Sequence, residues 1–321
     1  MSHMQLSFPI FTPSIKPVRQ SVKPKTKHLG FYLTNRDIQI MKAVYDYGGL
    51  TTHQIMALFF QPDKGQDHAT KAGRCWHRLK LLSDKKFLLR QEQLQYYSDG
   101  KKPFLYQLGE EGAKLLPKQF PDEYVTFDWQ PHRVISPHTI ANNDVRIAFT
   151  LGAVAPLTIS VWKNEDTLKA DHQRDTFLLP TPNGRAAKAR VEPDHYFLLL
   201  NGSYPYHCFV ETDLGTVAGE RSHWWERDWS RKVRAYLAYY TSGLYTKRYN
   251  THGWRVLTVT ISERRAANMK AVTERVGGKS RFWFTTFDRL HPSTVYHQPI
   301  WSVAGKSEPH RLLWDTPQQT A

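Results

Sequence analysis

The chain has 321 residues and a formal charge of +15, with 44 Lys and Arg against 29 Asp and Glu. This excess favours an acidic partner, nucleic acid first, because Lys and Arg supply most of the affinity for phosphate backbones. No apolar run approaches the roughly 20 residues of a membrane-spanning helix, and no charged-then-apolar signal opens the chain. Two Cys exclude a cysteine-based zinc cluster. We therefore expect a soluble, cytoplasmic protein without a membrane partner, long enough for two domains.

Residues 1–30 are predicted to form a basic, Pro-rich arm. Residues 5–28 hold four prolines and several lysines, with almost no acidic counterweight. Both an unstructured tail without a role and an arm that contacts DNA fit this composition.

Residues 31–120 have the pattern of a winged helix-turn-helix domain. Thr34 can cap a first helix, Thr51 or Thr52 a second, and a third is expected over residues 69–85. Two β-rich stretches then flank Asp99-Gly100, which is a strong hairpin signal. In the winged-helix geometry the third helix enters the major groove and the hairpin contacts the backbone or the minor groove.

The predicted third helix and wing are basic. Between Gln66 and Lys102, nine Lys and Arg face four Asp and Glu. Winged helices sometimes mediate protein contacts, but this charge favours double-stranded DNA. The expected DNA-contacting residues are Thr52, Lys71, Arg74, His77, Arg78, Lys80, Lys101 and Lys102.

Residues 121–137 are Pro-rich and aperiodic, and we expect a linker there. His132 and His138 raise the question of a metal site, but no HExxH motif or close partner supports one. Surface or capping roles are the better interpretation of both histidines.

Residues 138–304 alternate between helical and strand patterns, which predicts a small α/β sandwich around a mixed central sheet. A long helix is expected over residues 220–240, with Trp225 and Trp229 on its apolar stripe. Residues 305–321 show no regular pattern. The predicted fold class is thus an α+β winged helix followed by an α/β domain.

Three carboxylates stand in two apolar strands that a Gly/Pro turn joins. Pro193-Asp194 opens the first strand, and Glu211 and Asp213 close the second. Residues two apart in a strand share a face, and hairpin pairing would bring Asp194 to the same edge. Three such carboxylates repel one another unless a divalent cation or basic side chains stand between them. The sequence leaves both a metal site and a buried ion-pair network with the following helix open.

Three motifs resemble those of the replication-relaxation family of mobile-element proteins. They are EPDHYFLLL (residues 192–200), VETDLGT (residues 210–216) and RKVRAYLAYY (residues 231–240), preceded by the winged-helix pattern. The resemblance implies a DNA-binding accessory protein of a plasmid or other mobile element that acts in replication or relaxation. Other replication or transposition proteins and a second copy of the chain are the further partners that we consider.

The C-terminal motifs are also similar to the PD-(D/E)xK core of the restriction-endonuclease-like fold. In that core an Asp, and an acidic residue two before a Lys, hold Mg²⁺ beside the scissile phosphate. Asp194 and Glu211 match the acidic positions, but Asp213 stands where the Lys is expected. Lys232 on the next helix could restore the cation, and Asp144 could add a metal contact.

The resemblance therefore leaves alternatives for the function. A degenerate nuclease domain would make the protein a DNA binder without a cofactor. An active Mg²⁺- or Mn²⁺-dependent DNA endonuclease would use Asp194, Glu211 and Asp213 as metal ligands and Lys232 as the catalytic cation. A winged-helix transcriptional regulator is the third alternative.

Overall fold

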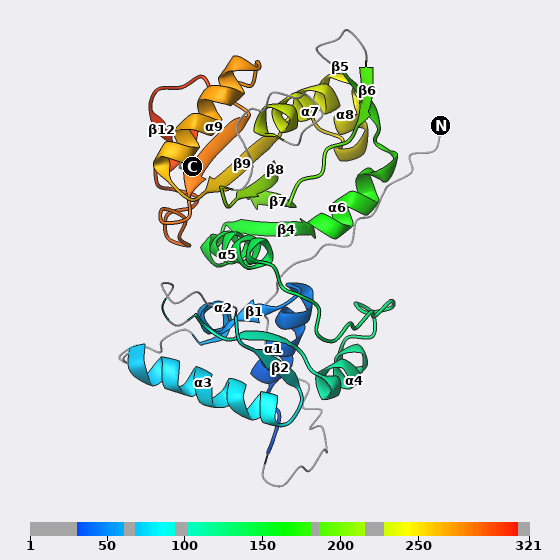
Figure 1. Ribbon diagram of the computed structural model, residues 1–321, viewed down its shortest axis with the longest axis vertical. Coiled ribbons are helices and arrows are strands. Elements are labelled where there is room, and N and C mark those ends of the chain that lie inside the picture. Colours follow the sequence, from blue (N-terminus) through cyan, green and yellow to red (C-terminus); the bar gives the residue numbers. More distant parts are fainter. Residues whose placement is uncertain are drawn as a thin grey trace, which may run out of the picture. The chain divides into compact units, whose positions relative to one another are not determined.

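The computed structural model describes residues 31–60, 68–93, 100, 102–180, 186–215 and 228–313 (Figure 1). The chain forms two compact units, which divide between Ile147 and Ala148. The predicted arm, the wing-tip residue Lys101 and the last eight residues lie outside the described ranges. No helix of the described residues is long and apolar enough to cross a membrane.

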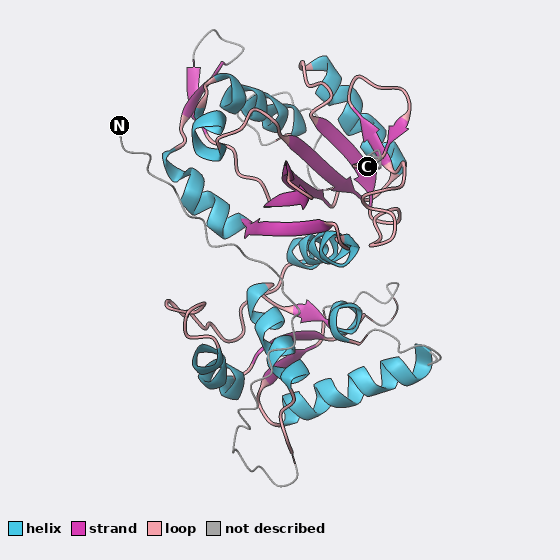
Figure 2. Cartoon of the chain, turned by 180° about the vertical axis from the view of Figure 1, so that it is seen from behind, coloured by secondary structure: helices cyan, strands magenta, loops and turns pink. Residues whose placement is uncertain are grey.

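The N-terminal unit combines helices with a small sheet. Its elements are α1 (Asn35–Asp46), β1 (Leu50–Thr51), α2 (Thr52–Phe59), α3 (His68–Asp84), β2 (Leu88–Gln91), β3 (Leu105–Leu108) and α4 (Glu110–Gln119). The strands form one antiparallel sheet in the order β1-β3-β2. Figure 2 shows the strands of the chain in magenta and its helices in cyan. Helix α5 (Pro137–Gly152) begins in this unit and ends in the other.

Side-chain caps fix where α1 and α2 begin. The hydroxyl of Thr34 accepts the backbone N–H of Asp37, whose carboxylate in turn accepts the backbone N–H of Thr34. Thr51 and Gln54 make the same reciprocal pair, so Thr51 rather than Thr52 caps α2. Each pair satisfies two backbone donors that a helix start leaves unpaired, which explains why the helices begin at these residues.

A buried ion pair connects α1 to α3. Asp37 is completely buried and its carboxylate pairs with the guanidinium of Arg78, with the Nε–Oδ1 contact at 2.7 Å. The same guanidinium donates to the backbone carbonyl of Tyr32 at 2.8 Å and lies over the ring of Phe31. A buried carboxylate needs such a partner, because an unpaired one costs several kcal/mol. The charge of Arg78 is thus engaged within the unit.

The C-terminal unit is a mixed α/β domain built on a seven-stranded sheet. After the end of α5 come β4 (Leu157–Asn164), α6 (Glu165–Asp171), a 3₁₀ turn (His172–Arg174), β5 (Phe177–Pro180), β6 (Ala186–Ala189), β7 (His195–Asn201), β8 (Tyr204–Asp213), α7 (Trp229–Thr241), α8 (Leu244–Tyr249), β9 (Arg255–Thr260), α9 (Glu263–Arg275), β10 (Phe282–Thr286), β11 (Trp301–Val303) and β12 (Pro309–His310). The sheet order is β12-β11-β10-β9-β8-β7-β4. Strands β8, β9 and β10 run parallel, and the outer pairs are antiparallel. The expected mixed central sheet is confirmed.

Helices α7 and α9 lie together over the sheet (Figure 1). The apolar stripe of α7 packs Tyr236 against Phe209 of β8, and Trp229 against Phe284 of β10. On β7, Tyr196 is paired with Phe209, and the next residue, Phe197, packs instead against Phe149 near the end of α5. Because successive side chains of a strand point to opposite faces, the sheet is covered on both sides.

Some elements have no counterpart in the prediction. Helix α6 occupies a polar stretch that shows no helical period, because it spans seven residues and buries one apolar side chain, Leu168. Strands β11 and β12 are two or three residues long, too short to leave a pattern, and β12 lies in the segment expected to be irregular. The start of the predicted long helix, with Trp225, lies outside the described residues.

We expect Asp37→Ala to destabilise the N-terminal unit by about 3 kcal/mol. The change leaves Arg78 without its buried partner and removes one of the two reciprocal bonds at the start of α1. This loss of stability lies at the lower end of the range for breaking a buried ion pair, because the Arg78 side chain is 24% exposed. Urea unfolding gives the cost. Asp84→Ala, which breaks an exposed pair with Lys80, is the control and should cost less than about 1 kcal/mol. Equal costs would contradict the assignment.

Candidate functional site

The hairpin of β7 and β8 brings two of the predicted carboxylates together. Its register pairs His195 with Val210, which sets Asp194, the residue before β7, beside Glu211. The carboxylate of Asp194 accepts the backbone N–H of Thr212 at 2.7 Å. Both acidic residues are buried. A predicted convergence of Asp194 and Glu211 is therefore present in the structure.

Helix α7 supplies the partners of Glu211. Lys232 forms an ion pair with one carboxylate oxygen, and the hydroxyl of Tyr236 donates to the other at 2.7 Å. Lys232 and Tyr236 are four residues apart, so they lie on the same face of the helix. Glu211 is 2% exposed, whereas the Lys232 side chain is 42% exposed. The ion pair thus connects a buried acid to a half-buried lysine.

Burial sets the electrostatics of this group. It raises the pKa of Glu211 to about 7, with Lys232 acting in the opposite direction and Asp194 adding to the rise. Burial lowers the pKa of Lys232, but the charges of Glu211 and Asp194 outweigh it, so the net pKa lies above its ordinary value. Lys232 therefore remains a cation, and Glu211 becomes a weak acid near neutral pH.

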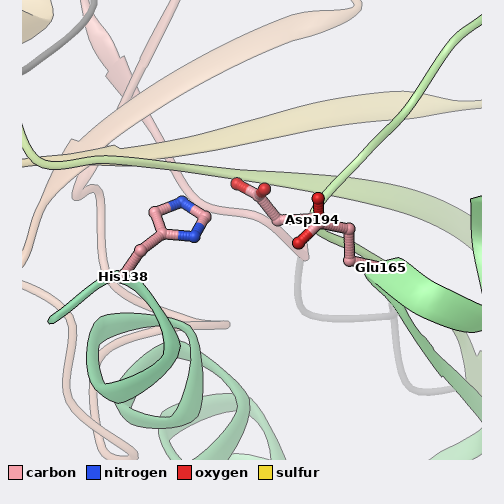
Figure 3. Close-up of side chains that lie close together, drawn as sticks. All are labelled: His138, Glu165 and Asp194. Atoms are coloured by element: carbon pink, nitrogen blue, oxygen red, sulfur yellow. The ribbon is translucent and has the colours of Figure 1, made fainter. Parts of the chain in front are cut away.

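A third carboxylate, which the sequence pattern did not reveal, belongs to the same group. Glu165 is the first residue of α6, whose start is capped by Asn164. Oxygens of Glu165 and Asp194 lie within 4.8 Å of each other (Figure 3). The charge of Glu165 also contributes to the raised pKa of Lys232. His138, drawn in the same view, is part of the N-terminal unit. The cap formed by Asn164 and Thr167 is the signal by which α6 could have been found.

Asp213 has different partners. Its two carboxylate oxygens accept bonds from the guanidinium of Arg265, both at 2.9 Å, and one of them also accepts the hydroxyl of Thr260 at 2.6 Å. Arg265 belongs to α9, whereas Lys232 belongs to α7. The structure thus joins Asp194, Glu211 and Lys232 and leaves Asp213 in an ion pair of its own.

The donors around Lys232 suit a hard divalent cation. Glu165, Asp194 and Glu211 offer carboxylate oxygens, the ligands that Mg²⁺ and Mn²⁺ take in proteins. Oxygens of Glu165 and Asp194 lie within 4.8 Å of each other, a separation that one bound ion can span. These residues could hold the predicted cofactor.

The sequence model of one protein family, described as replication-relaxation, matches residues 41–253. The chain belongs to the replication-relaxation family. This confirms the expected membership, and it suggests a role in replication or relaxation. The matched range contains α3, Asp194, Glu211 and Lys232. Neither the curated proteins nor the solved structures include a significant match to the chain.

In this replication-relaxation protein the predicted DNA-contacting residues of α3 divide into two sets. Arg74, His77 and Lys80 lie on its exposed face. Lys71 is buried, and Arg78 pairs with Asp37. Trp76, which no sequence pattern marks as functional, is 40% exposed and lies beside the ring of His77.

The other predicted residues of the N-terminal unit lie outside α3. Thr52, in the first turn of α2, donates to the backbone carbonyl of Phe104 at 3.4 Å. Lys102 is half-buried. Asp144, considered as a further metal ligand, belongs to this unit and accepts a hydrogen bond from Gln54 at 2.7 Å.

We expect the stability that Glu211 contributes to fall as the pH rises from about 4.5 to about 7. Because its pKa is higher in the folded protein, the folded state retains a proton that the unfolded chain releases. The contribution is complete below the unfolded pKa and is lost as the pH passes the folded one. This rise in the pKa of Glu211 corresponds to about 3 kcal/mol of unfolding free energy at most.

Urea unfolding of the wild type and of Glu211→Gln at several pH values measures this contribution. The wild type should lose more stability with rising pH than the Gln variant. The exposed Glu308→Gln should follow the wild type. Parallel curves for wild type and Glu211→Gln would contradict the raised pKa.

Proposed function

We propose that this protein binds duplex DNA and cleaves one or both strands during replication or relaxation of a plasmid or other mobile element. The observation that carries the proposal is the contact between Lys232 and Glu211 beside Asp194. It supports a nuclease core in which the cation comes from α7 rather than from the position two residues after Glu211.

The architecture of the C-terminal unit supports a restriction-endonuclease-like fold. An Asp precedes one strand of a central hairpin, and a Glu lies in the other strand, which then pairs in parallel with β9. A mixed sheet with helices on its faces provides the frame. Fold alone does not define an activity, so the proposal depends on the side chains at the hairpin.

Each residue of the cluster has a role in the proposed reaction. Glu165, Asp194 and Glu211 would hold Mg²⁺ or Mn²⁺ through carboxylate oxygens. When bound, such an ion would polarise a phosphate oxygen and lower the pKa of a water molecule. Lys232 would stabilise the negative charge that develops on the scissile phosphate, and its side chain is partly exposed.

Two further side chains complete this description. Tyr236 holds the second oxygen of Glu211 and so fixes the orientation of the carboxylate. Asp213 is left out of the proposed site, because Arg265 and Thr260 hold its oxygens.

A second candidate function is a non-catalytic DNA-binding protein. It is favoured by the same contact, since Lys232 and Tyr236 occupy both oxygens of Glu211. In that case the ion pair fixes α7 on the sheet and the domain needs no cofactor. The two candidates differ in whether the protein cleaves DNA when a divalent ion is added.

We expect the wild type to nick or linearise supercoiled plasmid with Mg²⁺ or Mn²⁺ and to be inactive with EDTA. Lys232→Met should reduce the rate by about 100-fold, because it removes the stabilising charge. Arg234→Met is the matched control, since Arg234 lies on α7 but contacts Ser230 rather than Glu211. It should cleave at the wild-type rate.

The half-exposed Glu165 provides a variant whose fold is not at risk. Glu165→Gln should also lose cleavage while its melting temperature stays unchanged. A wild type that leaves the plasmid intact with both ions would reject the nuclease function and favour the non-catalytic candidate.

We also propose that the N-terminal unit is a winged helix that places α3 on duplex DNA. Support comes from the order α1, β1, α2, α3, β2, β3 with a three-stranded antiparallel sheet. The exposed face of α3 carries Arg74, His77 and Lys80, and basic side chains on a helix of this kind contact phosphates and base edges in the major groove.

We expect Arg74→Ala to weaken duplex binding and to lower the slope of log affinity against log salt by about 0.9, one phosphate contact. A fluorescence titration at several salt concentrations measures both. Lys114→Ala is the control, because this exposed lysine lies on α4 and pairs with Glu110 and Glu111. An unchanged slope for Arg74→Ala would remove α3 from the DNA interface.

A further inference from the structure

A cavity of about 380 Å³ opens beside the proposed nuclease site. Its lining comes from α6, from the 3₁₀ turn that follows, and from the segment that leads into β7, namely Lys169, Ala170, His172, Gln173, Arg190 and Glu192. Two connections place it next to the site. The Lys169 ammonium lies 2.6 Å from the carboxylate of Glu165, and Glu192 stands two residues before Asp194.

One wall of the cavity is held rigidly. His172 is buried, its Nδ1 donates to the backbone carbonyl of Val191 at 3.0 Å, and its Nε2 accepts the hydroxyl of Tyr249 at 2.8 Å. Burial lowers the pKa of His172, so the ring stays neutral in this arrangement. Nearby, Arg248 and Tyr239 both bind Asp175. A wall fixed by such bonds makes the cavity preformed, as binding sites usually are.

The rim of the cavity carries groups that bind phosphate. Lys169 and Arg190 are exposed cations, and Gln173 adds an exposed amide donor. Nearby acidic groups, Glu165 above all, raise the pKa of Lys169 and keep it charged. Lys188 is also exposed, on β6 just before Arg190, and continues the basic surface away from the cavity. Arg and Lys paired with polar donors are the groups with which proteins hold phosphate oxygens.

We propose that this cavity binds a backbone phosphate of the DNA strand, adjacent to the phosphate at the proposed nuclease site. The substrate in this inference rests on the proposed function. Lys169 lines the cavity and pairs with Glu165 of the proposed nuclease site. Because every nucleotide of a strand carries a phosphate, we expect a strand held at that site to offer a neighbouring phosphate to Lys169 and Arg190.

A free nucleotide offers similar phosphate chemistry, and Glu192 argues against it. A terminal phosphate carries about −1.5 to −2 charges at pH 7, whereas a phosphodiester carries one. The carboxylate of Glu192 in the lining repels the first more strongly than the second. The ion pair between Lys169 of the cavity and Glu165 of the carboxylate cluster also favours a strand that contacts both.

The test is DNA binding by the full chain in EDTA, where no cleavage takes place. Arg190→Ala and Lys169→Ala should each weaken binding of a fluorescent duplex by about 3- to 10-fold and lower the salt slope by about 0.9. Lys279→Ala, an exposed lysine of the same unit outside the cavity, should change neither quantity. Unchanged melting temperatures will show that the variants fold, and Arg190→Glu should weaken binding further than Arg190→Ala.

Three results would overturn the inference. The first is wild-type affinity and salt slope in both cavity variants, and the second is the same losses in Lys279→Ala. The third is that 1 mM deoxyadenosine monophosphate displaces the duplex from the wild type but not from Arg190→Ala, since this would assign the cavity to a free nucleotide. The readout is independent of catalysis. Weaker binding by the cavity variants of a protein that never cleaves DNA would reject the nuclease function and leave the phosphate site standing.

Discussion

The burial of Glu211 is the constraint on which the C-terminal unit depends. A carboxylate inside an apolar sheet is unfavourable unless its oxygens are bound, and here Lys232 and Tyr236 bind them from one helix. The same two contacts fix α7 against β8. The need to bind the oxygens of Glu211 thus determines how α7 packs on the sheet. It also brings the cation of Lys232 near Asp194 and Glu165.

The two acidic positions of β8 show how the same residue type can be used in different ways. Glu211 and Asp213 share a face of the strand, yet each is neutralised by a different helix. Lys232 contacts Glu211 through a single flexible ammonium, whereas Arg265 binds Asp213 with two parallel bonds. The bidentate pair is the more rigid of the two. The Lys232 pair has further carboxylates nearby, Asp194 and Glu165, which is why we propose that it serves a reaction as well as the fold.

The elements with a strong period or a continuous apolar run could be predicted from the sequence. The hairpin of β7 and β8 is one example, because a Gly-containing turn between apolar strands brings Asp194 and Glu211 together by local geometry alone. The contact of Lys232 with Glu211 could be anticipated from its place on the next helix. Glu165 could not be predicted, because its proximity to Asp194 comes from packing between distant segments. Partner choice for buried charges, as in Arg78 with Asp37, likewise leaves no trace in local patterning.

The order of these contacts along the chain has a consequence for local unfolding. Asp194 and Glu211 are brought together by a hairpin of neighbouring strands. Lys232, the cation that pairs with Glu211, lies further along the chain on α7. If α7 detached from the sheet while the hairpin stayed intact, water would reach Glu211 and return it to its ordinary acidity. Both carboxylates would then be charged, and their repulsion would act on the hairpin itself. Docking of α7 and the charge balance of the sheet edge are therefore one cooperative event.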